Sequence, residues 1–97
     1  MKKPSDILVT DPIHPVATEL LTKAGFNVVE LPEAMRPRLA EFIGPYEALI
    51  CRTSTTIDKQ VFAEAKNLKC IALASTGYDR IDINEATEHN VAVLGLP

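Results

Sequence analysis

The residues best suited to chemistry in this sequence are an arginine and the hydroxyl side chains that follow it. Arg52 comes directly after the apolar run Ala48–Cys51, and Thr53 and Ser54 come next. If the run is a strand, the Arg52 guanidinium projects from a rigid strand end, and its fork of N–H donors suits a carboxylate or a phosphate. Thr53 and Ser54 add hydroxyl donors. This segment predicts a binding site for a small anion.

A second turn with suitable chemistry follows the apolar run Cys70–Ala74. It consists of Ser75, Thr76 and Gly77. Because Gly77 has no Cβ, the backbone N–H groups of this turn can come close to an anion, and such amides bind an anion without any side chain. We therefore add Thr76 and Gly77 to the candidate anion site.

Purely structural roles for these residues stay open at this point. Arg52 could form an ion pair at the rim of the fold with Asp11 or Asp79. Gly77 could be a plain turn, and the two hydroxyl residues before it could cap the local backbone. Ligand binding and these structural roles are served by the same residue types, so the residue types alone do not distinguish between them.

The histidines and cysteines predict no catalytic or metal centre. His14 precedes Pro15, as at the start of a helix, and no serine or cysteine is tied to it by spacing. His89 falls in the last turn of an expected helix, where the helix dipole explains it. Cys51 and Cys70 lie in apolar runs and form no C-x-x-C motif, so we expect buried thiols without metal or redox chemistry.

Five apolar runs rich in β-branched residues must position these side chains. They are nearly continuous rather than alternating, which is typical of strands that are buried on both faces of a parallel sheet. The runs are Ile7–Thr10, Val28–Leu31, Ala48–Cys51, Cys70–Ala74 and Val91–Leu94.

Two helices are expected between the first three runs. The first begins at Pro15, which suits the first helical position, and ends at Gly25, which permits a left-handed exit. Its apolar stripe consists of Val16, Leu20, Leu21 and Ala24. The second helix is expected from near Pro37 to Gly44, after a loop over residues 31–36.

Two further helices are expected to begin at aspartates. Asp58 is the predicted N-cap of the third helix, flanked by Ile57 and Phe62 as a hydrophobic staple. Asp82 is the predicted N-cap of the fourth helix, where the Glu85 carboxylate is expected to reach back to the cap. Asn90 is expected to take the left-handed exit.

Alternation of strand and helix predicts an α/β fold. Five strands with four intervening helices favour a flavodoxin-like, doubly wound, five-stranded parallel sheet of order 2-1-3-4-5. In such a sheet ligands bind beyond the carboxyl ends of the strands, near the point where the strand order reverses. That point lies between the first and third strands, where Asp11 and Arg52 follow.

Composition limits the class of protein further. The chain has 97 residues, 46% apolar and 24% charged, which is typical of one globular domain. The net charge of −3 argues against nucleic acid as a partner. Neither a secretory leader nor a membrane-spanning run is expected, and the cytoplasm is the predicted location.

The spacing of the glycines excludes a nucleotide cradle in this segment. The chain has 4 glycines, and none of them are spaced as in the dinucleotide fingerprint or the P-loop. Two other functions of this fold are also disfavoured. A receiver domain needs an acid at the end of the third strand and a lysine after the fifth, but Cys51-Arg52 and Gly95-Leu96 stand there. A flavodoxin needs a phosphate loop where Asp11 to Pro15 stand.

Taken in order, five segments resemble the amino-terminal part of D-isomer-specific 2-hydroxyacid dehydrogenases. The phosphoglycerate dehydrogenase group is nearest, followed by glyoxylate or hydroxypyruvate reductases. The segments are Ile7–Pro12, Leu20–Val28, Tyr46–Arg52, Leu68–Asp82 and Ala86–Val93.

The resemblance implies that residues 1–97 are the substrate-binding (catalytic) domain of an enzyme that moves hydride between NAD(H) and a small 2-hydroxy or 2-keto acid. Arg52 and Ser54 would lie in the substrate loop, and the Thr76-Gly77 turn would offer amides to the substrate carboxylate. NAD would be bound by a downstream domain that carries the glycine fingerprint and the catalytic residues, so we expect this chain alone to be inactive.

The same resemblance implies an uncovered surface. In the family the carboxy-terminal segment returns to complete the substrate domain, so the isolated chain should expose an apolar patch and self-associate, and the parent protein should be a homo-oligomer. The alternative is a stand-alone module of this fold that binds a small anion or drives oligomerisation.

Overall fold

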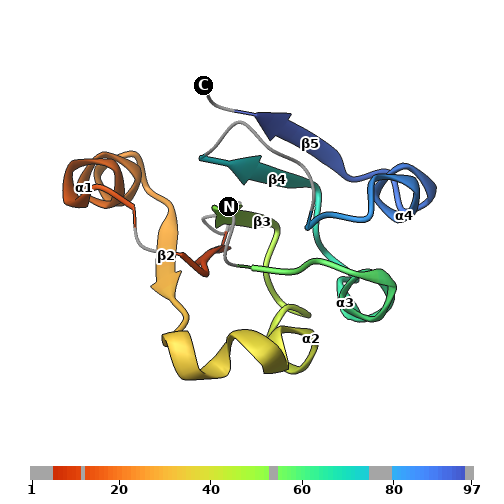
Figure 1. Ribbon diagram of the computed structural model, residues 1–97. Coiled ribbons are helices and arrows are strands. Elements are labelled where there is room, and N and C mark those ends of the chain that lie inside the picture. Colours follow the sequence, from red (N-terminus) through yellow and green to blue (C-terminus); the bar gives the residue numbers. More distant parts are fainter. Residues whose placement is uncertain (1–5, 12, 53–54, 75–79, 96–97) are drawn as a thin grey trace.

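A five-stranded parallel sheet forms the centre of the molecule (Figure 1). The computed structural model describes residues 6–11, 13–52, 55–74 and 80–95. The strands are β1 (Asp6–Val9), β2 (Asn27–Glu30), β3 (Ala48–Cys51), β4 (Cys70–Leu73) and β5 (Ala92–Gly95), in the order β2-β1-β3-β4-β5. The predicted α/β class and strand order are confirmed, and the order reverses between β1 and β3.

The helices occupy both sides of the sheet unequally. They are α1 (Pro15–Lys23), the 3₁₀ helix η1 (Glu33–Arg38), α2 (Leu39–Phe42), α3 (Lys59–Glu64) and α4 (Ile83–Glu88). In Figure 1, α1 stands apart on one side, while α2, α3 and α4 lie together on the other. The packing of α2 on α3 and of α3 on α4 is consistent with this view.

The core lies between the sheet and the layer of α2, α3 and α4. Leu8, Leu49 and Ile71 occupy the same register on β1, β3 and β4, and all are buried. Phe62 from α3 packs into the same cluster, with Leu39 and Ile43 beside it. Each such side chain that is fully buried stabilises the fold by roughly 1.5–3 kcal/mol.

The other face of the sheet is only half covered, which contradicts the expectation that every strand is buried on both faces. Along β3 and β4 buried residues alternate with partly exposed ones, and most of β5 is exposed. Only β1 has successive buried residues on both faces. The physical reason is that α1 is the sole described helix on this side, and it packs against β2.

The capping predictions hold with one exception. Asp58 and Asp82 accept the backbone N–H groups of Val61 and Glu85, both at 3.1 Å. The Glu85 carboxylate, however, does not reach back, because the Asp82 N–H already donates to the Ile57 carbonyl at 2.9 Å. That carboxylate lies 3.6 Å from His89 Nδ1 instead.

The chain reversals at helix ends are also as predicted. Gly25 has φ +98° and Asn90 has φ 57°, so both take the left-handed conformation that ends a helix. The segment before Pro37 was expected to be a loop, but it forms the 3₁₀ helix η1, which contains Pro37 and continues into α2. A 3₁₀ helix, with hydrogen bonds between residues three apart, accommodates this short, proline-containing stretch better than an α-helix does.

Candidate functional site

The carboxyl ends of β1 and β3 lie side by side where the strand order reverses. Val9 on β1 is in register with Ile50 on β3, and the Thr10 N–H donates to the Ile50 carbonyl at 3.0 Å. Asp11 and Arg52 follow these strands, so the two segments that the sequence placed at the switch point do meet. This edge is where a sheet of this topology binds its ligand.

Asp11 is the centre of the edge. Its side chain is buried, with 2% of the residue exposed. One oxygen, Oδ2, accepts the Arg52 backbone N–H at 2.6 Å and lies 2.9 Å from the Thr55 hydroxyl. A single carboxylate oxygen therefore ties β1 to both described residues that flank positions 53 and 54.

Hydroxyl groups complete this buried cluster. The Thr55 Oγ1 lies 2.9 Å from Thr10 Oγ1 as well as from Asp11. A carboxylate can only accept, so the Thr55 hydroxyl donates to Asp11 and accepts from the Thr10 hydroxyl. Thr10 and Thr55 are each 1% exposed, and with Asp11 they are the buried polar side chains of the described chain.

Arg36 supplies the positive charge that faces Asp11. Its Nε donates to the Thr10 carbonyl at 2.7 Å and lies 3.3 Å from Asp11 Oδ1, while its Nη1 is 3.8 Å from Glu33. Sequence reasoning missed Arg36 because it assigned this segment to a loop. The available signal was Asp11 itself, because a carboxylate that follows a buried central strand requires a cationic partner.

The Arg52 side chain is exposed at the end of β3, as predicted. Its expected alternative role was an ion pair with Asp11 or Asp79. In the structure Arg36, and not Arg52, forms the ion pair with Asp11. From Arg52, Asp11 accepts the backbone N–H alone. In the described ranges no carboxylate pairs with the Arg52 guanidinium, while Asp79 lies outside them. Within those ranges the guanidinium is thus available to an anion on this edge.

An apolar groove of about 550 Å³ opens beside Arg52. It lies between α1 and the uncovered face of β3 and β4, and Arg52 and His14 are its polar residues. The apolar lining residues are Ile13, Ala17, Leu20, Leu21, Ile50, Ala72 and Ala74. This groove corresponds to the apolar patch that was expected on the isolated chain.

The other predicted site residues cannot be placed. Ser54, Thr76 and Gly77 lie outside the described residues. Their roles in binding a substrate stay predictions.

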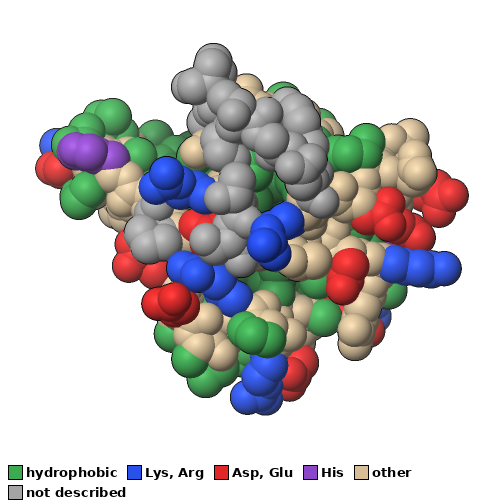
Figure 2. Space-filling view, in the orientation of Figure 1, with side chains coloured by type: hydrophobic (Ala, Val, Ile, Leu, Met, Phe, Trp, Pro, Cys, Tyr) green, Lys and Arg blue, Asp and Glu red, His purple; other side chains and the backbone are tan. Residues whose placement is uncertain are grey.

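Figure 2 shows that Lys and Arg side chains gather in the middle of one face of the molecule.

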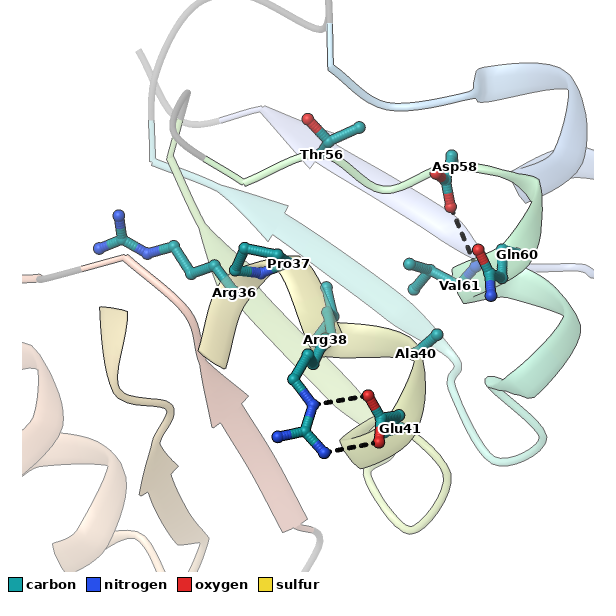
Figure 3. A pocket seen from close by; sticks show the side chains of 10 residues that line it. Arg36, Pro37, Arg38, Ala40, Glu41, Thr56, Asp58, Gln60 and Val61 are labelled. Carbon is teal, nitrogen blue, oxygen red and sulfur yellow. Dashed lines mark hydrogen bonds and ion pairs between the residues drawn. The ribbon is translucent and has the colours of Figure 1, made fainter. Parts of the chain in front are cut away.

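A second hollow, of about 330 Å³, lies between η1, α2 and the start of α3 (Figure 3). Its charged groups are already paired: Arg38 donates to Glu41 at 2.7 and 2.9 Å, and Asp58 caps α3. The hydrogen bonds raise the pKa of Arg38 and lower the pKa of Glu41. Arg36 points away from these side chains in Figure 3. This hollow therefore offers an anion less than the edge at Arg52 does.

The histidines and cysteines have structural explanations. His14 Nδ1 accepts the Val16 N–H at 3.1 Å at the start of α1, and the His89 ring stacks on Phe62 at 5.8 Å. Both cysteines are free, although Cys70 is only partly buried rather than buried as expected. Burial first, and then the nearby Asp11, raises the pKa of the Cys51 thiol to about 12.

The family described as D-isomer specific 2-hydroxyacid dehydrogenase, catalytic domain, has a model that matches residues 7–97. D-3-phosphoglycerate dehydrogenase of Archaeoglobus fulgidus is 37% identical over 91 residues, which are 94% of this chain and 17% of that protein. Hydroxypyruvate reductase of Thermotoga maritima is 33% identical over 92% of this chain and 29% of its own length. The chain thus spans less than a third of these relatives.

Solved structures agree with these matches. The 3-phosphoglycerate dehydrogenase of Entamoeba histolytica with NAD+ bound has a TM-score of 0.86 and 29% identity, over 97% of this chain and 33% of that one. D-lactate dehydrogenase of Escherichia coli has a TM-score of 0.75 over 95% of this chain and 31% of its own. Its 21% identity shows the shared fold alone.

Proposed function

Because the chain belongs to the D-isomer specific 2-hydroxyacid dehydrogenase family, we propose that it is the substrate-binding domain of an NAD-dependent enzyme of that family. Such an enzyme transfers hydride between NAD(H) and a 2-hydroxy or 2-keto acid. The relatives named D-3-phosphoglycerate dehydrogenase and hydroxypyruvate reductase support 3-phosphoglycerate or hydroxypyruvate as the kind of substrate.

The observation that carries this proposal is the Arg52 guanidinium. It stands exposed at the carboxyl edge of β3, beside β1, where the strand order reverses. A guanidinium binds a carboxylate through two parallel N–H bonds, which fixes the plane of the acid as well as its position. A 2-keto acid held in this way presents one orientation of its C2 carbon for hydride attack.

The described residues do not fit NAD itself. A dinucleotide needs a glycine-rich turn between a strand and a helix, but β1 runs into the buried side chains of Thr10 and Asp11. Gly25 ends α1, and Gly44 follows α2. We therefore propose that a separate domain of the parent enzyme binds NAD and that residues 1–97 alone are inactive.

Domain organisation can be tested on the gene. We expect the coding sequence after residue 97 to contain G-x-G-x-x-G about fifty residues on, in a strand-to-helix context. A stop codon before that motif would instead favour the stand-alone module that binds a small anion or drives oligomerisation. Oxidation of NADH by the 97-residue chain with glyoxylate or hydroxypyruvate, above a control without protein, would contradict its inactivity.

Binding is tested by titrating the isotope-labelled chain with D-3-phosphoglycerate and with glyoxylate while its backbone amides are followed by NMR. We expect the signals of Arg52 and Thr55 to move, and the Arg52→Ala variant to bind about tenfold more weakly because it loses a charge-assisted pair. Arg38→Ala is the matched control, since it removes an arginine that is already paired with Glu41. Equal affinity in all three proteins would remove Arg52 from the site.

The cytoplasm and a homo-oligomeric assembly complete the proposal. Free cysteines support a reducing compartment, and the apolar groove beside α1 supports association. No helix in the described ranges is long and apolar enough to cross a membrane. Fractionation of cells that express the parent gene, followed by sedimentation of the purified parent protein, tests both points.

A further inference from the structure

One carboxylate holds the two residues on either side of positions 53 and 54. Asp11 Oδ2 accepts the Arg52 N–H at 2.6 Å and the Thr55 hydroxyl at 2.9 Å. We propose that Asp11 is a positioning residue of the substrate site, which fixes the backbone of Arg52 so that its guanidinium meets the acid in one geometry. This inference rests on the proposed function, because it concerns the residue that binds the acid there.

Packing alone does not explain a carboxylate at this place. Asp11 is 2% exposed, and burying a charge is costly unless it is paired and hydrogen-bonded. An apolar residue would fill the same space at the end of β1 without that cost. What an apolar residue lacks is an acceptor for the Arg52 N–H and the Thr55 hydroxyl, and both bonds join the end of β1 to the substrate segment.

The remaining contacts of Asp11 keep it in place. Oδ1 has no hydrogen-bond partner among the described residues, although Arg36 Nε lies 3.3 Å away. Arg36 itself is fixed by its 2.7 Å bond to the Thr10 carbonyl. The Arg36 guanidinium on η1 thus fixes the position of Asp11, and Asp11 in turn fixes the backbone of Arg52. Neither Asp11 nor Arg36 needs to touch the substrate for this role.

This arrangement separates two properties of the site. The charge that attracts the acid belongs to the exposed Arg52 side chain, whereas the geometry in which it is presented depends on Asp11 and Thr55. Loss of the Asp11 bonds should therefore weaken the binding of an acid while Arg52 is still present. A residue with a purely structural role would lower the stability of the fold without changing the affinity of the folded chain.

The test uses the 97-residue chain and its Asp11→Ala, Thr55→Val and Thr55→Ser variants. Asp58→Ala is the matched control, because Asp58 also accepts a backbone N–H but caps α3 away from the site. Two quantities are measured for each: the hydrogen-exchange rate of the Arg52 amide and the affinity for D-3-phosphoglycerate and glyoxylate. The midpoint of thermal unfolding is recorded beside them.

We expect Asp11→Ala and Thr55→Val to speed exchange at the Arg52 amide and to weaken acid binding by about tenfold, the effect of losing one hydrogen bond to a charged group. Thr55→Ser keeps the hydroxyl, so its exchange rate and its affinity should match those of the unaltered chain. Asp58→Ala should lower the unfolding midpoint and change neither. If Asp11→Ala does not fold, the milder pair at Thr55 decides the question.

The outcomes separate this inference from the proposed function. If the unaltered chain binds neither acid, the proposed function fails and the role of Asp11 fails with it. If the unaltered chain binds an acid and the Asp11 and Thr55 variants bind it equally well, Arg52 keeps its role and the positioning role of Asp11 is overturned. Unchanged exchange at the Arg52 amide in Asp11→Ala would also overturn it.

Discussion

At the residue scale, the buried polar groups of the described chain gather at one place. Thr10, Asp11 and Thr55 lie together at the junction of β1 and β3. Buried polar clusters of this kind are tolerated when their members satisfy one another, and they then fix a local geometry more narrowly than apolar packing does. The buried polar side chains of the described residues therefore lie at the candidate site.

Arg52 and Arg36 show what the sequence does and does not reveal at this scale. Arg52 was predictable because it directly follows an apolar run, so the end of a strand places it. Arg36 was not predictable, because it contacts Asp11 from η1, 25 positions away along the chain. No periodic pattern in a sequence predicts a 3₁₀ helix. Which of several arginines faces a buried acid depends on tertiary packing, which local patterns do not contain.

Removal of the Arg36 charge should destabilise the fold. We expect Arg36→Met to lower the free energy of unfolding by about 2–4 kcal/mol, because it leaves the buried Asp11 carboxylate without its cation. Arg38→Met is the control, since the Arg38 to Glu41 pair is exposed and should contribute little. Denaturant unfolding measures both, and an equal loss in the two variants would contradict the role given to Arg36.

The Cys51 thiol should make stability fall at high pH. Its pKa is raised from 9.0 to about 12 in the folded chain, so between these values the unfolded chain loses a proton that the folded chain keeps. Stability from this group is complete below pH 9 and is lost as the pH approaches 12, by at most about 1.4 kcal/mol per pH unit. Cys51→Ala should be less stable at neutral pH but show a shallower alkaline decline, and an identical decline would contradict the buried thiol.

At the element scale, the sequence was most informative where a helix begins or ends. Asp58, Asp82, Gly25 and Asn90 act through bonds or backbone angles within a few residues of themselves, so their types alone indicate their roles. The coverage of the second sheet face was not predictable. An apolar strand residue reads the same whether it is covered by its own chain or left open, and Ile50 is an example.

The N-cap of α3 should be measurable on its own. Asp58→Ala removes the acceptor of the Val61 N–H and should cost about 1 kcal/mol of stability, whereas Asp58→Asn keeps an acceptor and should cost much less. Thermal unfolding of the two variants gives the comparison. Equal losses would mean that the charge of Asp58, and not its cap bond, stabilises the helix.

The end of α1 should tolerate only glycine well. Gly25 has φ +98°, and an added Cβ would meet nothing within 4 Å, so Gly25→Ala should cost about 1 kcal/mol through backbone strain alone. Gly44→Ala is the matched control. There the added Cβ would lie 3.8 Å from the Glu64 carbonyl, an ordinary contact. Unfolding free energies that fall equally for both would contradict this distinction.

At the scale of the whole molecule, the uncovered sheet face dominates solution behaviour. Leu20 on α1 is 61% exposed and Leu94 on β5 is 54% exposed, and the groove of about 550 Å³ lies between α1 and the central strands. A monomer rarely leaves such a surface open to water. The 17% of the Archaeoglobus relative that this chain spans is consistent with a face that further chain would cover.

Self-association should depend on that face. We expect sedimentation to show oligomers of the isolated chain at high concentration and Leu20→Glu to shift it toward monomer, because a charge there opposes burial. Ile83→Glu is the control, since Ile83 is also exposed but lies on α4 in the other layer. A monomer at every concentration, or equal effects of the two variants, would contradict the prediction.

The reversal of strand order also bears on how the site comes into being during folding. Neighbouring strands elsewhere in the sheet pair residues that are 21 or 22 positions apart, such as Asp6 with Asn27 and Ala48 with Cys70, but β1 meets β3 at a separation of 41, as Ile7 with Ala48. The entropy of closing a chain loop rises only slowly with its length, by about 0.6 kcal/mol per doubling. The Asp11 bonds span 41 and 44 positions and close with this longest loop. A chain that has joined β1 to β3 has thereby brought Asp11 to Arg52, so recovery of Arg52 amide protection during refolding would time the pairing of β1 with β3.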